Sequence, residues 1–176
     1  PDIGDKGTEA VPEGLDYDLW TGPAEMKPFS RNYVHYNWHW HWNYGNGDVG
    51  NQGIHETDLC MWGLNVGFPE KITSMGGKFL WNDSKETTEV LTSNYHYPSQ
   101  KKMIEFEVRP WNTNTEDGTG IGNIFYGSEG YMVVKGYNDY ATFLGKDKKP
   151  GPARKEGGDH YKNFVEAVIA KNPAFM

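Results

Sequence analysis

The sequence predicts an α+β fold in which a mainly antiparallel β-sheet is covered by helices on one face. Short runs rich in β-branched and aromatic residues are separated by Gly, Pro, Asn or Asp, a pattern typical of strands joined by short loops. Two longer segments, 48–64 and 159–171, have the periodicity of helices instead. The chain has 176 residues, a length that suits one domain. The predicted strands are 71–80, 88–97, 101–109, 122–127, 130–135 and 139–144.

Composition and charge exclude several classes of protein. The net charge is -7, which argues against a nucleic-acid partner, because phosphate binding requires clustered Lys and Arg. No apolar run approaches the length of a membrane-spanning helix, so no membrane partner is predicted. Cys60 is the single cysteine and cannot form an internal disulfide. These features are compatible with a cytoplasmic or a periplasmic location.

The first 44 residues contain two contrasting segments. Residues 1–32 are rich in Pro, Gly and acidic residues, and we expect an extended lead-in to the domain formed by 33–176. Between 37 and 42, Trp alternates strictly with Asn or His, which predicts a strand with two distinct faces. We expect its Trp side chains to point inward, and Asn37, His39 and His41 toward a cleft or solvent. Alternatively, the aromatic rings form a platform that binds carbohydrate.

The predicted helix 48–64 carries a polar stripe that could take part in catalysis. Asp48 or Asn51 is expected to cap it, and Gly63 or Gly67 to end it. Histidine is the usual proton carrier near neutral pH, and a neighbouring carboxylate can orient it. The stripe therefore suits proton transfer at an alcohol or carbonyl carbon. In the alternative interpretation Asn51 is only a cap and the histidine is an interior residue. At helical spacing the stripe comprises Asn51, His55, Asp58 and Trp62.

The C-terminal half is predicted to complete the sheet and to add one helix. In 101–109, Ile104, Phe106 and Val108 share one face of a strand, while acidic and basic residues occupy the other. The final helix is expected to begin at the cap residue Asp159 and to lay its apolar stripe on one face of the sheet.

Two motifs are weighed and set aside. The residues Gly45–Gly50 spell G-x-G-x-x-G, but the segment before them is not an apolar parallel strand, so no cofactor-binding site is predicted in this chain. The histidines do not follow a dense ligand spacing such as His-Glu-x-x-His, so no metal site is predicted. A metal-dependent enzyme remains an alternative that uses some of His35, His39, His41, His55, Asp48 and Asp58.

Four segments in the same order resemble one known family. They are "VPEGLDYDLWTGPA" (11–24), "HYNWHWHWNYGNGDVGNQGIHETDLCMWGL" (35–64), "FYGSEGYMVVKG" (125–136) and "HYKNFVEAV" (160–168). Together they resemble the C-terminal domain of Gfo/Idh/MocA oxidoreductases. The resemblance implies a large open sheet, a substrate domain that is truncated at both ends, and an N-terminal Rossmann domain that is absent from this sequence.

The resemblance also implies a function and a set of site residues. It implies the substrate-binding part of an NAD(P)-dependent oxidoreductase for a sugar, polyol or derivative. NAD or NADP would bind the full-length enzyme, and none is expected in this fragment. His55 matches the family's histidine, but Asn51 stands where its Asp-x-x-x-His pattern has aspartate. Asp58 would support His55. A homodimer through the sheet is expected.

The family's catalytic lysine lies in a Glu-Lys-Pro motif of the Rossmann half, which this sequence lacks. Because the cofactor carries the hydride chemistry, this fragment is expected to be inactive alone. The alternatives are a stand-alone carbohydrate-binding module and a fragment of an NAD-dependent sugar hydrolase or epimerase. The expected substrate-binding residues are Tyr36, Trp38, His39 and His41.

Overall fold

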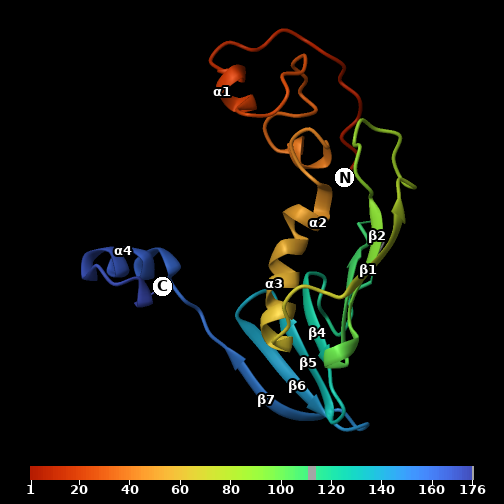
Figure 1. Cartoon of the computed structure of the whole chain (residues 1–176), viewed down its shortest axis with the longest axis vertical. Coiled ribbons are helices and arrows are strands. Elements are labelled where there is room, and N and C mark those ends of the chain that lie inside the picture. Colours follow the sequence, from red (N-terminus) through yellow and green to blue (C-terminus); the bar gives the residue numbers. More distant parts are fainter. Residues whose placement is uncertain (111–113, 176) are drawn as a thin grey trace. The chain divides into compact units, whose positions relative to one another are not determined.

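The computed structural model describes residues 1–110 and 114–175, and it divides into two compact units, Pro1–Asn114 and Thr115–Met176 (Figure 1). The α+β class with antiparallel strands is confirmed, and the strands are divided between two sheets. Unit 1 contains α1 (Tyr17–Thr21), α2 (Gly47–Asn51), α3 (Gly53–Leu64), β1 (Lys71–Gly77), β2 (Val90–Tyr97) and β3 (Lys102–Val108). Unit 2 contains β4 (Gly122–Tyr126), β5 (Gly130–Lys135), β6 (Asp139–Leu144), β7 (Lys149–Lys155) and α4 (His160–Ala170).

Unit 1 is built on the sheet β1-β2-β3, with α3 against β3. The predicted alternation in β3 is confirmed, because Ile104 is buried at 5% exposure whereas Glu105 and Glu107 are exposed. Helix α3 lies close to this face at Gly53, where an added Cβ would come within 2.6 Å of the Phe106 ring. A glycine at the start of α3 therefore allows the helix to approach the sheet.

The helix predicted over 48–64 is present as two pieces, α2 and α3, which meet at Gln52. The expected caps are wrong. Neither helix has a side-chain cap at its N-terminus, and α3 ends at Asn65 in the left-handed conformation, with φ 50°. Asn is one of the few non-glycine residues that adopts this conformation readily, so it ends the helix where glycine was expected.

Residues 1–32 are largely irregular, and they pack on the aromatic tract 33–44. Helix α1 begins at Asp16, whose side chain accepts a hydrogen bond from the Leu19 N–H at 2.9 Å. The Tyr17 and Phe29 rings meet edge to face with their centroids 5.2 Å apart, and the Trp20 and Tyr44 ring centroids are 4.9 Å apart. Large aromatic rings thus supply much of the buried apolar surface in this part of the chain.

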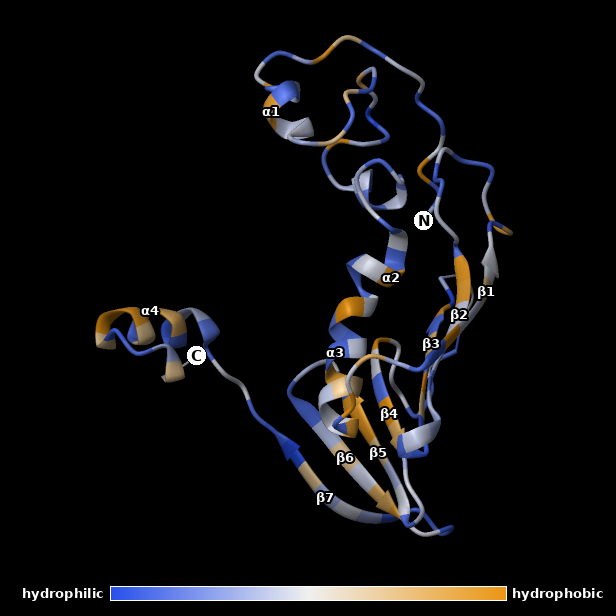
Figure 2. Cartoon of the chain, in the orientation of Figure 1, coloured by the Kyte–Doolittle hydropathy of each residue, from blue (hydrophilic) through white to orange (hydrophobic). Residues whose placement is uncertain are grey.

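Unit 2 is built on the sheet β4-β5-β6-β7, and strand β5 carries its most buried side chain, Val133 at 1% exposure. Figure 2 shows apolar residues concentrated along β5 and on α4. Strand β7 is not among the predicted strands, and it contains Pro150 and Pro152, which disfavour a strand interior. Its position at the sheet edge accommodates both prolines, which cannot donate to a ladder.

Helix α4 has the predicted cap and the predicted apolar stripe. The Asp159 side chain accepts a hydrogen bond from the Lys162 N–H at 2.9 Å. The expectation that this stripe is buried on a face of the sheet is wrong, since its members are between 52% and 76% exposed. They are Tyr161, Phe164, Val165, Val168 and Ile169.

The close approach of α3 to β3 can be tested with Gly53→Val. Valine is no worse a helix former than glycine, so a loss of stability would report the clash with Phe106. We expect the free energy of unfolding to fall by about 1–3 kcal/mol, the usual cost of overpacking. Urea unfolding followed by circular dichroism measures it. Gly67→Ala is the control, because an added Cβ there meets nothing within 4 Å. Unchanged stability of Gly53→Val would contradict this packing.

Candidate functional site

The aromatic tract is not the strand that its alternation predicts. It forms turns and the short 3-10 helix Asn37–Trp40. The expected orientation is confirmed for Trp40, which is 5% exposed. It is wrong for His39 and His41, each 2% exposed, and for Trp42 and Trp38, which are 61% and 38% exposed. In a 3-10 helix the side chains repeat every three residues, so an alternation of two no longer separates an inner from an outer face.

Backbone carbonyls explain why imidazoles are tolerated in the interior. His39 Nδ1 lies 2.7 Å from the Tyr36 carbonyl oxygen, and His41 Nε2 lies 3.1 Å from that of Asn32. Hydrogen bonds of this kind offset the cost of burying a polar ring. Gly45 fits beside His39, where a Cβ would lie 2.6 Å from the His39 Cα. Burial lowers the pKa of His41, although Glu86 opposes the shift, so this ring is neutral at neutral pH.

The predicted polar stripe is on the accessible side of α2 and α3. Asn51 is half-buried, and His55 and Asp58 are exposed. The interpretation of His55 as an interior histidine is therefore wrong. The buried polar residue of α3 is Glu56, 7% exposed, whose Oε1 accepts a hydrogen bond from Gln52 Nε2 at 3.0 Å. Of the expected site residues, Asn51 lies at the end of α2 and is half-buried, and His55 and Asp58 lie on α3 and are exposed, whereas His39 and His41 are buried.

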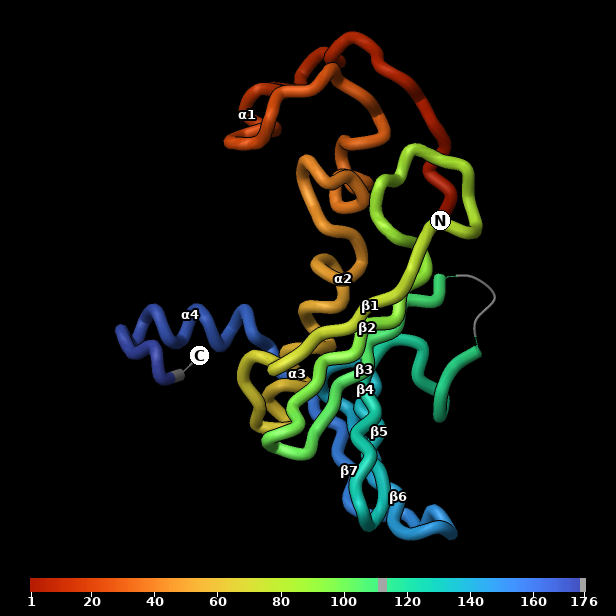
Figure 3. Tube along the Cα trace, turned by 45° about the vertical axis from the view of Figure 1, so that its right-hand side comes forward, coloured from red at the N-terminus to blue at the C-terminus, as the bar shows by residue number. Residues whose placement is uncertain are grey.

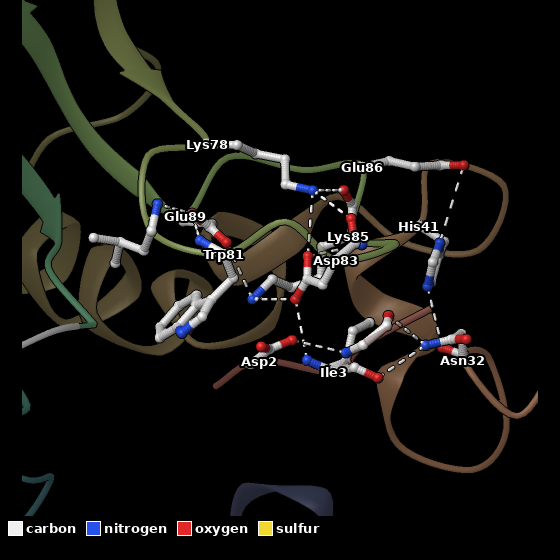
Figure 4. A network of polar contacts seen from close by, with 12 residues as sticks. Asp2, Ile3, Asn32, His41, Lys78, Trp81, Asp83, Lys85, Glu86 and Glu89 are labelled. Atoms are coloured by element: carbon white, nitrogen blue, oxygen red, sulfur yellow. Dashed lines mark hydrogen bonds and ion pairs between the residues drawn. The ribbon is translucent and has the colours of Figure 1, made fainter. Parts of the chain in front are cut away.

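A buried lysine, Lys85, is the centre of a polar network that sequence analysis did not identify (Figure 4). Its side chain is 3% exposed, and its Nζ lies 3.1 Å from Asp83 Oδ2 and 3.3 Å from Glu89 Oε1. The same ammonium group donates to the Pro1 carbonyl oxygen at 2.5 Å, and it lies 4.2 Å from the centre of the Trp81 ring. The carboxylates and the indole together compensate for burial of the charge.

Glu89 is held by the backbone of the β1–β2 loop. Its Oε2 accepts hydrogen bonds from the N–H groups of Phe79 at 3.0 Å, Leu80 at 2.9 Å and Trp81 at 3.4 Å. Burial by itself would raise the pKa of Glu89. The hydrogen bonds from Leu80 and Phe79, together with Lys85, outweigh burial and lower it. The pKa of Asp83 is lowered in the same way, with burial opposed by the Ile3 N–H, Lys85 and Lys78.

The network connects the β1–β2 loop to both the N-terminal segment and the tract, and Figure 3 shows this loop beside the N-terminus. The Ile3 N–H donates to Asp83 Oδ2 at 3.0 Å, and the Ser84 N–H to the Gly4 carbonyl at 3.1 Å. On the other side, the Glu86 N–H donates to the Trp40 carbonyl at 2.9 Å. The loop thereby anchors the tract that precedes α2.

The sequence offered one weak signal for this network. Lys85 lies in a polar run between the predicted strands 71–80 and 88–97, and Glu89, four residues later, lies at the start of the second; such a run is normally a solvated loop. Nothing local indicates that the lysine is buried, because its partners Pro1 and Trp40 are distant in sequence.

Two further features bear on cofactor and metal binding in the described part of the chain. The glycines of the G-x-G-x-x-G run serve internal packing: a Cβ on Gly47 would lie 2.9 Å from Thr87, and one on Gly50 would collide with the Asn46 side chain. Among the described residues, no group of three or more His, Cys, Asp or Glu could hold a metal ion. Within the same residues, none of the helices combines the length and apolarity needed to cross a bilayer.

Residues 4–72 match the model of the oxidoreductase family Gfo/Idh/MocA, described as its C-terminal alpha/beta domain. This stretch is therefore similar to the C-terminal domain of Gfo/Idh/MocA oxidoreductases, and the resemblance is confirmed there. No curated protein matches the chain. A solved structure from Bacteroides fragilis NCTC 9343, provisionally assigned as an oxidoreductase, is 15% identical with a TM-score of 0.43. The match covers 72% of this chain and 42% of that one, so the chain spans less than half of its length.

Removing the buried charge of Lys85 tests the network. Lys85→Met leaves Asp83 and Glu89 without their shared partner, and we expect the free energy of unfolding to fall by about 3–5 kcal/mol. Chemical unfolding followed by tryptophan fluorescence measures the change. The matched control is Lys146→Met at an exposed lysine of the β6–β7 turn, where a change within about 0.5 kcal/mol is expected. Equal stability of the two variants would contradict the role of Lys85.

Stability is expected to fall on acidification in two stages. The pKa of His41 is lowered from 6.5 in the folded state, so its contribution is present above pH 6.5 and is lost as pH falls through the lowered value. The pKa of Glu89 is lowered from 4.5, so its contribution is lost only below pH 4.5. Thermal unfolding at a series of pH values measures both stages.

Glu89→Gln should be less stable at neutral pH and should weaken the second stage alone. Glu105→Gln, on the exposed face of β3, is the control and should retain both stages. A second stage unchanged in Glu89→Gln would show that other carboxylates cause the acid sensitivity.

Proposed function

We propose that this chain is the substrate-binding part of an NAD(P)-dependent oxidoreductase that acts on a sugar, polyol or derivative. The observation that carries the proposal is the exposed imidazole of His55 on α3, inside the segment that matches an oxidoreductase family. A Rossmann domain outside this sequence would supply the cofactor, and its nicotinamide would accept the hydride released from the substrate carbon.

His55 is the group that exchanges a proton with the reacting hydroxyl. As an alcohol is oxidised, its carbon loses a hydride and its oxygen loses a proton, which His55 accepts in our proposal. Exposure suits this role, because the ring must reach a substrate that arrives from outside the chain. Asn51, one turn earlier, is proposed to orient a hydroxyl, since an amide both donates and accepts hydrogen bonds but does not take up a proton.

The walls of the site are proposed to be aromatic. Tyr36 is 67% exposed and Trp38 is 38% exposed, so both rings are available to stack on a sugar. His39 and His41 are removed from the set of substrate contacts, because each is buried and hydrogen-bonded to a carbonyl. They are proposed instead to hold the tract in place. Asp58 is proposed to support His55 from the following turn of α3. A homodimer that forms through the sheet is also proposed.

The proposal is tested first at the gene and then by kinetics. Sequencing the DNA upstream of the Pro1 codon should reveal a strand–GxGxxG–helix segment and a Glu-Lys-Pro motif. The protein encoded by the full reading frame is then assayed for NADH or NADPH formation with a panel of sugars and polyols. His55→Gln should lower kcat about 10²-fold or more, the usual contribution of general acid–base catalysis, with little change in sugar affinity.

The matched control is His160→Gln, at an exposed histidine of α4 that is not part of the polar stripe containing His55. This variant should retain full turnover. The rival is a stand-alone carbohydrate-binding module, favoured by the exposed rings of the tract. Sugar binding that survives His55→Gln and is lost in Trp38→Ala, with no upstream Rossmann segment, would replace the proposal by that rival.

A further inference from the structure

A row of rings crosses the sheet of unit 2. Tyr126 on β4 stands directly opposite Tyr131 on β5, which stands opposite Phe143 on β6, and Phe143 is paired with Pro150 on β7. The ring centroids of Tyr126 and Tyr131 are 6.0 Å apart, and those of Tyr131 and Phe143 are 5.0 Å apart. The Tyr131 and Phe143 rings are stacked at an interplanar angle of 24°, and the Tyr126 ring is tilted by 31° against Tyr131. The ring side chains therefore continue across all four strands of the sheet.

The outermost ring of the row is exposed yet held in place. Tyr126 is 70% exposed, so its ring is accessible to a ligand. Its hydroxyl donates a hydrogen bond to Glu116 Oε1 at 2.8 Å. Glu116 is itself fixed in a tight hairpin, where its N–H donates to the Thr119 carbonyl at 3.1 Å. The tilted contact with Tyr131 and the hydrogen bond to Glu116 thus hold the Tyr126 ring before any ligand arrives.

Charged groups of both signs border the row. Glu116 and Asp117 provide carboxylate acceptors, and Lys148 provides an ammonium donor 5.4 Å from the centre of the Tyr131 ring. Lys148 Nζ also lies 3.9 Å from Asp117 Oδ1. An anionic ligand would meet the two carboxylates, and a cationic ligand would compete with Lys148 for the aromatic face. The surroundings therefore favour a neutral ligand that both donates and accepts hydrogen bonds.

We propose that the row Tyr126–Tyr131–Phe143, with Glu116 and Lys148 at its border, is a binding surface for a neutral oligosaccharide. The C–H faces of a sugar ring carry partial positive charge and fit the negative face of an aromatic ring. Sugar hydroxyls donate to carboxylates and accept from an ammonium group. This surface lies within unit 2, so it does not depend on the function proposed for α3 and the tract of unit 1.

The test titrates the isotopically labelled chain with cellohexaose and with maltohexaose, without cofactor, and follows the backbone amide signals by NMR. We expect saturable shifts at residues 124–133 and 142–148 with at least one of the two oligosaccharides. Tyr126→Ala should weaken that affinity about tenfold, in the range of one lost aromatic contact. Tyr126→Phe, which retains the ring but loses the bond to Glu116, should weaken it less. Tyr137→Ala is the control, at a tyrosine that is 56% exposed in the β5–β6 turn.

The outcomes separate this surface from the site of unit 1. Shifts confined to unit 1, lost in Trp38→Ala and retained in Tyr126→Ala, would overturn the proposal. The absence of saturable shifts with both oligosaccharides would overturn it as well. Failure of the full-length protein to oxidise any sugar would sink the proposed oxidoreductase while leaving these binding results intact. If Tyr126→Ala does not fold, the shifts of the wild-type chain and the affinity of Tyr126→Phe still decide the question.

Discussion

The buried ammonium group of Lys85 is the constraint on which the arrangement of unit 1 depends. A charge in the interior is stable only when it is paired, and removing a partner leaves an uncompensated charge. Lys85 meets this requirement with Asp83, Glu89 and the Pro1 carbonyl, beside the Trp81 ring. These partners come from the N-terminal segment and the β1–β2 loop, so pairing the charge brings the two together. The loop in turn holds the aromatic tract through the Trp40 carbonyl.

The histidines of this stretch have different roles as a result of this arrangement. His39 and His41 are buried and bonded to carbonyl groups, so they stabilise the tract and are not available to a ligand. His55 remains exposed because α3 turns Glu56 and Gly53 toward the interior instead. The same anchored tract leads into α2 and α3, and it therefore determines where the polar stripe begins. Structural and proposed chemical roles are carried by different imidazoles in one short stretch of sequence.

Local patterns predicted the regular elements well where they were strong. The strands from β1 to β6 and the helices at 47–64 and 160–170 lie where periodicity and punctuation indicated. The failures have physical reasons. Strand β7 contains Pro150 and Pro152, and proline is tolerated in a strand mainly at a sheet edge. The sequence does not indicate which strand forms the edge, so this strand could not be predicted. The Trp/His alternation indicated a strand, but the tract folds as a 3-10 helix whose conformation is set by contacts with residues 1–32 and the β1–β2 loop.

The sequence by itself determined the α+β class, the antiparallel strands and the cap at Asp159. All of these depend on residues a few positions apart, whose geometry is fixed by the backbone repeat. Only the tertiary structure decided that His39 and His41 are interior residues, that Lys85 is buried between two carboxylates, and that Tyr126, Tyr131 and Phe143 form one row. Those outcomes depend on pairing between distant segments, as between Ile3 and Asp83, eighty residues apart. Register and long-range partners set them, and no local pattern records either.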